Sequence, residues 1–149
     1  MLQAMRYVLV VLVLIALAVV AAAIYFRLAP MPAETWHVDP ATATAPDSPN
    51  FTLRRGADAI MLPDAPATVA ARLAATAEGE GATLIAGALE DGFATYVVRS
   101  RLMGYPDAIS IRLTGADGGT RAEVFSRSRF GYSDMGVNAA RVARWFDLP

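Results

Sequence analysis

The stretch Phe125-Ser-Arg-Ser-Arg-Phe-Gly-Tyr-Ser-Asp-Met-Gly-Val-Asn-Ala-Ala-Arg141 gathers serines, arginines, an aspartate, an asparagine and two glycines in one short window. Its first part predicts a strand that ends near Phe130, and Gly131 provides the backbone freedom that a turn requires. Ser133 or Asp134 can then cap a helix by accepting hydrogen bonds from its free N–H groups. Because most of the chain is Ala, Val, Leu and Ile, this density of polar groups indicates either a site or a demanding backbone geometry.

Upstream of this unit, apolar segments alternate with short turns. The predicted strands are Ala82–Leu89, Phe93–Met103, Ala108–Thr114 and Arg121–Phe130. The turns between them are too short to hold crossover helices, which predicts an antiparallel meander of about four strands.

One helix precedes this meander and another follows it. The first begins at Pro63-Asp64-Ala65-Pro66 and ends at Gly79, and its apolar residues recur at helical spacing. The second runs from Ser133 or Asp134 to Phe146, with an apolar face made of Met135, Ala139, Val142 and Phe146. A helix at each end of a meander indicates a small α+β domain of two layers.

The amino terminus carries an uncharged apolar run of 20 residues, from Tyr7 to Phe26. This length is enough to cross a hydrocarbon core of about 30 Å, so we expect a transmembrane helix over residues 1–27 that contacts the lipid bilayer. A cleaved signal peptide is the alternative, because Ala21-Ala22-Ala23 could supply a cleavage site. The retained anchor is favoured, since the apolar run continues through Phe26.

Basic residues are distributed unevenly on the two sides of this run. Arg6 lies on the amino-terminal side, whereas no basic residue follows Arg27 until Arg54. The positive-inside rule therefore places the amino terminus in the cytoplasm and the domain outside. We expect a single-pass protein of the bacterial inner membrane with a periplasmic carboxy-terminal domain.

The composition argues against several classes of function. The 149 residues have a net charge of −1, which gives no electrostatic reason to expect a nucleic-acid partner. Cysteine is absent, which rules out disulfides, thiolate metal sites and cysteine nucleophiles. The only histidine, His37, has one carboxylate nearby, Asp39, and these are too few ligands for a metal. We therefore expect neither a metal nor another cofactor.

Residues 28–50 contain five prolines and predict an extended, semi-rigid linker before the domain of residues 51–149. Within this linker, Trp36-His37-Val38-Asp39-Pro40 combines two aromatic rings with a carboxylate. We expect it to pack against the domain or the membrane interface.

Arginines gather on one face of the predicted sheet. Side chains alternate along a strand, so one face can hold Arg99, Arg101, Arg112, Arg127 and Arg129. Two interpretations stay open: an ordinary solvated face, or an anion site, because clustered guanidinium groups repel one another unless an anion or a carboxylate joins them.

The strand–turn–helix unit also has two interpretations. Ser128, Asp134, Asn138 and Arg141 can form a buried polar joint between the last helix and the last strand. Alternatively, they line a ligand pocket at the helix N-terminus, a place that suits anions. The predicted ligand-binding residues are Arg99, Arg101, Arg127, Ser128, Arg129, Asp134, Asn138 and Arg141.

Two segments of the chain resemble the domain-of-unknown-function 1499 family (DUF1499). The first is Ser126-Arg-Ser-Arg-Phe-Gly-Tyr-Ser-Asp-Met-Gly-Val-Asn138, followed by Arg141, and the second is the turn Gly104-Tyr105-Pro106-Asp107. The family often has a second acidic residue after this turn, where the chain has Ala108, which argues against a paired-carboxylate role. The resemblance implies bacterial membrane or exported proteins, or plastid proteins, and no particular reaction.

Catalysis is not predicted. A nucleophilic serine needs a base, and His37 lies far away in the sequence. The motifs of a nucleophile elbow and of a P-loop are both missing. We therefore expect a binding or interaction module for an anionic ligand or an envelope partner. The alternatives are a structural component of an envelope complex, and a hydrolase or transferase that acts on a phosphate-bearing substrate.

Overall fold

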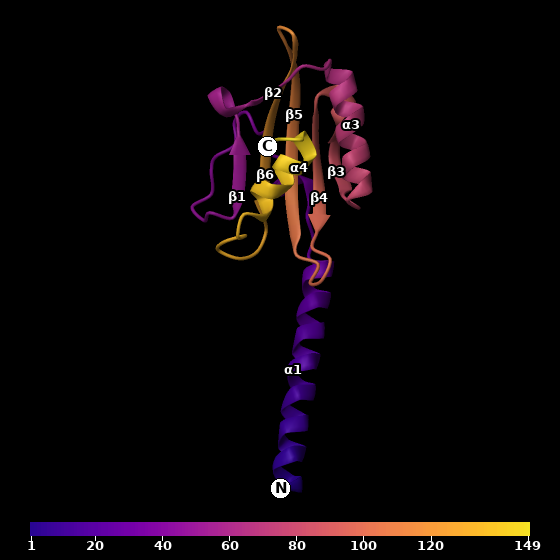
Figure 1. Cartoon of the computed structure of the whole chain (residues 1–149), viewed down its shortest axis with the longest axis vertical. Helices are drawn as coiled ribbons and strands as arrows, with labels where there is room; N and C mark the ends of the chain where they lie inside the picture. The colour runs from indigo at the N-terminus through magenta and orange to yellow at the C-terminus, as the bar shows by residue number, and fades with distance from the viewer.

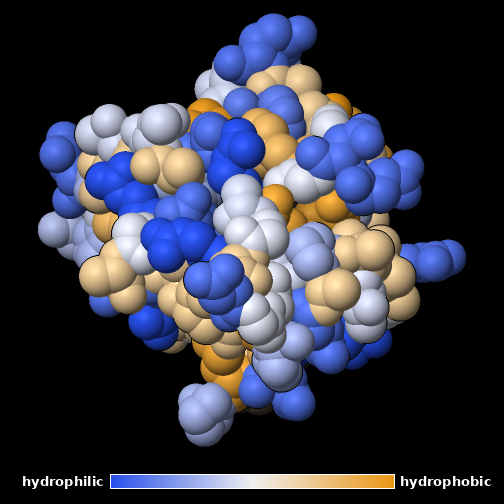
Figure 2. Space-filling model, turned by 90° about the horizontal axis from the view of Figure 1, so that it is seen from above, coloured by the Kyte–Doolittle hydropathy of each residue, from blue (hydrophilic) through white to orange (hydrophobic).

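The computed structural model describes residues 1–149 as a long helix followed by a layered domain (Figure 1). Helix α1 (Leu2–Leu28) projects away from the domain and buries none of its residues. It is long and apolar enough to cross a membrane. At the opposite end of the molecule, Figure 2 shows hydrophilic side chains over much of the surface, interspersed with weakly hydrophobic ones.

A single antiparallel sheet of six strands forms the centre of the domain. The strands are β1 (Phe51–Arg54), β2 (Ile60–Leu62), β3 (Thr83–Ala88), β4 (Phe93–Arg99), β5 (Pro106–Ala116) and β6 (Gly119–Ser128). Their order is β1-β6-β5-β4-β3, and β2 pairs with β6 beyond the end of β1. The predicted meander is therefore confirmed as β3 to β6, and the α+β class with it. Sequence periodicity missed β1 and β2, because three or four residues are too few to show an alternation.

Two helices cover one face of the sheet. Helix α3 (Pro66–Gly79) starts with a proline in its first turn and buries Val69 and Leu73. Helix α4 (Val137–Phe146) buries Trp145 and Phe146 against the same core. The strands contribute aliphatic side chains to this face, including Ile109, Ile111 and Val124.

Helix α4 begins at Val137, and not at Ser133 or Asp134 as the sequence predicted. Met135 and Gly136 have positive φ angles, of 50° and 82°, so the chain is not helical there. Met135 is 94% exposed and does not belong to the apolar face of the helix. The physical reason is a tight loop in which Asp134 folds back on the next residues and turns Met135 away from the core.

The sequence predicts a spacer for the proline-rich segment. In the structure this segment lies across the other face of the sheet. It includes the short helix α2 (Ala33–Trp36). The His37 ring stacks on Phe93 with 4.0 Å between ring centroids, and His37 Nδ1 lies 2.8 Å from Thr95 Oγ1. These contacts confirm that the Trp36–His37 region packs against the domain, and they make the segment a third layer.

Candidate functional site

Asn138 is the centre of a buried polar network between α4 and the sheet. Its side chain is fully buried, and its Oδ1 accepts hydrogen bonds from Ser126 Oγ at 2.6 Å and from Arg141 Nη1 at 2.8 Å. Its Nδ2 donates to Ser128 Oγ at 3.0 Å and to Asp134 Oδ2 at 2.7 Å. All the hydrogen-bonding capacity of this amide is therefore used within the protein, which joins the helix to the last strand.

An ion pair extends this network to strand β5. Arg141 Nη2 donates to Asp107 Oδ2 at 2.7 Å, and the two side chains are only 6% and 10% exposed. Two charges removed from water are stable only when they are paired with good geometry, so each depends strongly on the other. The pair fixes Asp107, at the start of β5, to the middle of α4.

Asp134 closes the loop that precedes α4. Its carboxylate accepts hydrogen bonds from the backbone N–H groups of Gly136, at 3.1 Å, and Asn138, at 2.8 Å. Partial burial opposes ionisation, but these hydrogen bonds and that of the Asn138 side chain outweigh it and lower the pKa of Asp134. Asp134 is therefore a carboxylate that orders the loop, and it has no readily available proton for acid catalysis.

A cavity of about 560 Å³ lies beside this network. Its polar lining comes from serines and aspartates of the β4–β5 connection, β5, β6 and the loop before α4: Ser100, Asp107, Ser128, Ser133 and Asp134. Its apolar lining includes Phe26, from the last turn of α1. The remaining apolar lining residues are Tyr105, Phe130, Met135 and Val137. The cavity thus lies where the domain meets α1.

Two kinds of group in the cavity remain free to bind a ligand. They are carboxylate oxygens, which accept hydrogen bonds, and hydroxyl groups, which donate them. Ser128 Oγ accepts from Asn138, and Ser100 Oγ accepts from Tyr105 N at 2.9 Å, so each hydroxyl retains its hydrogen for donation. Asp107 uses Oδ2 for Arg141, which leaves Oδ1 without a protein donor. No arginine lines the cavity. This arrangement suits hydroxyl or amino groups better than an anion.

A comparison with protein-family models places the chain in a known family. The model "Protein of unknown function (DUF1499)" matches residues 27–148. The chain belongs to the DUF1499 family. No curated protein and no solved structure matches it. The two segments that carry the DUF1499 resemblance, 104–107 and 126–138, are far apart in the sequence and both line the cavity.

The match also starts ahead of the region in which the sequence placed the DUF1499-like domain. Residue 27 is the end of the apolar helix, and the match includes the whole proline-rich segment. This range agrees with the packing of that segment on the sheet, because His37 and Asp39 contact strands β4 and β5.

The arginine-rich face of this DUF1499 domain is covered by its own chain. Arg112 binds Asp39 through two hydrogen bonds, one of them 2.7 Å from Nε to Oδ1. Arg99 donates to the backbone oxygens of Phe26 and Ala29, both at 2.8 Å. Asp39 thus provides one carboxylate for the cluster of arginines, and backbone carbonyls provide further acceptors.

Arg127, like Arg99, has no carboxylate partner. It is buried between the Phe125 and Trp36 rings, at 4.3 and 5.0 Å from their centroids, and donates to Trp36 O at 3.0 Å. Its Nη1 is buried without a hydrogen-bond partner. Burial lowers the pKa of Arg127 to about 10.

The predicted site residues therefore fall into three places. The network joins Ser128, Asp134, Asn138 and Arg141, and Arg99 and Arg127 contact the segment on the opposite face of the sheet. Arg101 is exposed in the β4–β5 connection, and Arg129 lies 5.2 Å from the Phe130 ring. A role in ligand binding stays a prediction for all eight of these residues. Sequence reasoning did not include Asp107 and Phe26, although the turn 104–107 was a signal for Asp107.

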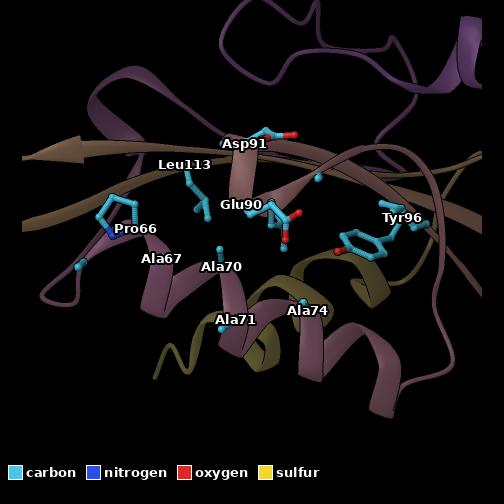
Figure 3. Close-up of a pocket in the computed structure, with 14 residues that line it drawn as sticks. Pro66, Ala67, Ala70, Ala71, Ala74, Glu90, Asp91, Tyr96 and Leu113 are labelled. Carbon is cyan, nitrogen blue, oxygen red and sulfur yellow. The ribbon is translucent and has the colours of Figure 1, made fainter.

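A second, larger hollow of about 780 Å³ lies between α3 and strands β3 to β5 (Figure 3). Alanines of α3 form much of its lining, and Glu90, Asp91 and Tyr96 are its main polar residues. Burial and the negative charge of Glu90 raise the pKa of Tyr96, so its phenol stays protonated. The segments 104–107 and 126–138 do not line this hollow. The cavity beside Asn138, which both segments line, is therefore the better candidate site.

Proposed function

We propose that the chain is a single-pass protein of the bacterial inner membrane and that its periplasmic domain is a small-molecule binding module. The length and hydropathy of α1 support the anchor. The scarcity of basic residues between Arg27 and Arg54 supports the orientation. The ligand site in this proposal is the cavity between the buried network and the end of α1.

The single observation that carries the binding function is the mixed lining of this cavity. Asp107 and the serine hydroxyls offer acceptors and donors, and Phe26, Tyr105 and Phe130 offer apolar surface. Sites of this kind orient a ligand with a few polar groups and bind it with apolar contact. We therefore propose an amphipathic ligand whose hydroxyl or amino groups bind to Asp107 and Ser128.

Anion binding, as expected from the sequence, is the second candidate. The observation that favours it is the buried Nη1 of Arg127, which has no partner. An anion could reach this group only if the Trp36 region moved from the sheet, because Trp36 covers the guanidinium. Catalysis is less supported: His37 hydrogen-bonds with Thr95, on the face of the sheet opposite the cavity.

Filling the cavity tests the binding function without removing a member of the network. Val137 lines the cavity and is half-exposed, so Val137→Trp should fill part of it. The matched control is Ala139→Trp, an exposed position on the same helix. We expect mass spectrometry of the gently purified full chain to find a bound small molecule that survives Ala139→Trp and is lost in Val137→Trp. Equal retention in both variants would contradict the proposed site.

A further inference from the structure

We propose that the domain rests on the bilayer surface through two loops at its α1 end, residues 100–105 and 129–136, which we call the loop end. In this arrangement Leu102, Tyr132 and Met135 lie among the lipid headgroups. The inference depends on the proposed function only through its anchor, since it requires α1 to cross the bilayer. It does not depend on a ligand in the cavity.

The length of α1 sets the level of the bilayer surface. The apolar run from Tyr7 to Phe26 rises about 1.5 Å per residue, which gives about 30 Å, the thickness of the hydrocarbon core. One interface therefore lies near the last turn of α1, where Tyr25 and Arg27 provide an interfacial ring and a charge.

Direct contacts hold the loop end at this same level. Arg27 Nη2 donates to the backbone oxygens of Arg101, at 2.9 Å, and Leu102, at 2.7 Å. Gly104 has a φ of +76°, and a Cβ at this position would approach Arg27 Cγ to 2.2 Å. The close approach of the loop to α1 therefore requires glycine. Figure 1 shows the β4–β5 connection at the domain end of α1.

The second loop is attached to α1 through aromatic rings. The Phe26 ring lies 4.1 Å from Tyr105 and 5.1 Å from Phe130, and Tyr25 lies 5.9 Å from Phe130. Phe130 begins the turn that carries Tyr132 and Met135. Both loops thus include residues that touch the last turn of α1.

Large apolar side chains point outward from this end of the domain. Leu102 is 82% exposed, Tyr132 75% and Met135 94%, and none of them packs in the core. Exposed apolar groups of this size mark interaction sites, and at the level of a bilayer interface lipid is the partner at hand. The opposite end of the molecule shows many hydrophilic side chains with hydrophobic ones between them (Figure 2).

The charges of the loop end also fit an anionic lipid surface. Arg101 and Arg129 flank the apolar side chains, and the single carboxylate of the two loops, Asp134, accepts hydrogen bonds from Gly136 and Asn138. Basic side chains near a membrane are attracted to anionic headgroups. A bilayer therefore fits the loop end in position, in hydropathy and in charge.

The absence of cysteine allows single-site labels to test this arrangement. We would place an environment-sensitive fluorophore on the full chain at Leu102→Cys and Met135→Cys, and reconstitute it in vesicles of phosphatidylcholine and phosphatidylglycerol. Val13→Cys reports the middle of α1, and Asp117→Cys reports the exposed β5–β6 turn. Lipids with a quencher at a shallow or a deep position of the acyl chain then give the depth of each label.

We expect blue-shifted emission and shallow quenching at 102 and 135, deep quenching at 13 and no quenching at 117. If the label at position 13 is deeply quenched but the labels at 102 and 135 are as unquenched as the label at 117, the docking is overturned and the anchor stays intact. An unquenched label at 13 would overturn the anchor, and with it the docking.

Discussion

The charges of Asp107 and Arg141 balance each other, and neither side chain forms another ion pair. Both side chains are at least nine-tenths buried, and their hydrogen bond is 2.7 Å long. The Arg72–Asp64 pair on the surface has a similar distance of 2.9 Å, but its side chains are 44% and 41% exposed. The two pairs therefore differ mainly in how much water could replace a lost partner.

Asp107→Asn should destabilise the domain much more than Asp64→Asn. The first change leaves the Arg141 charge buried without a counter-ion, for which we expect a loss of about 3–5 kcal/mol in the free energy of unfolding. The second affects an exposed pair and should cost about 1 kcal/mol or less. Chemical denaturation of the full chain in micelles measures both, and equal losses would refute the role assigned to the buried pair.

At the scale of elements, the proline-rich segment behaves as a layer because side chains of the sheet bind it. Arg112 binds Asp39, and this contact lowers the pKa of Asp39 mainly through the hydrogen bond with Arg112. The Phe93 ring supports this contact from β4, with the Arg112 guanidinium 4.9 Å from its centroid and the His37 ring stacked on it. The segment is therefore attached at several points, each of which is only partly exposed.

Asp39→Asn should loosen this segment without unfolding the sheet. Loss of one partly exposed ion pair corresponds to about 1 kcal/mol, or an increase of about fivefold in local opening. Hydrogen exchange of the amides in residues 33–42 would measure the change. Asp47→Asn is the matched control, because Asp47 is exposed and has no ion pair in the structure. Unchanged exchange in Asp39→Asn would show that the ion pair does not hold the segment.

At the scale of the whole molecule, the end of α1 is built into the domain. Arg99 donates to Phe26 O and Ala29 O, so a side chain of β4 binds two backbone carbonyls at the carboxy-terminal end of the helix. Arg27 reaches in the opposite direction, to the backbone of the β4–β5 connection. These reciprocal contacts set the direction in which the domain leaves the helix.

Arg99→Gln should therefore broaden the orientation of the domain relative to the membrane. A glutamine is shorter and has no charge, so it cannot satisfy both carbonyls. The distance distribution between a spin label at Asp117→Cys and labelled headgroups should widen in this variant and stay narrow in Arg54→Gln, a change at an exposed arginine of β1. A distribution that stays narrow in both would show that other contacts fix the angle.

The local pattern of the sequence was sufficient for the elements that are long or periodic. The 20 apolar residues from Tyr7 to Phe26, the alternation in β4 to β6 and the spacing of Val69, Leu73 and Ala77 each act through neighbours in the chain. The long apolar helix, the α+β class, the antiparallel meander and the family could therefore be predicted. The polar joint could also be predicted, because Asn138 and Arg141 lie on neighbouring helical positions near Ser128.

Only the tertiary structure decided where distant segments meet. Asp107 pairs with Arg141, and Phe26 joins the cavity, because the sheet brings the start of β5 next to α4 and next to the end of α1. Arg99, Arg112 and Arg127 contact residues 26–39 of the same chain, where backbone carbonyls and Asp39 accept their hydrogen bonds. Such contacts depend on three-dimensional packing between residues more than 30 positions apart, and no local pattern in the sequence records them.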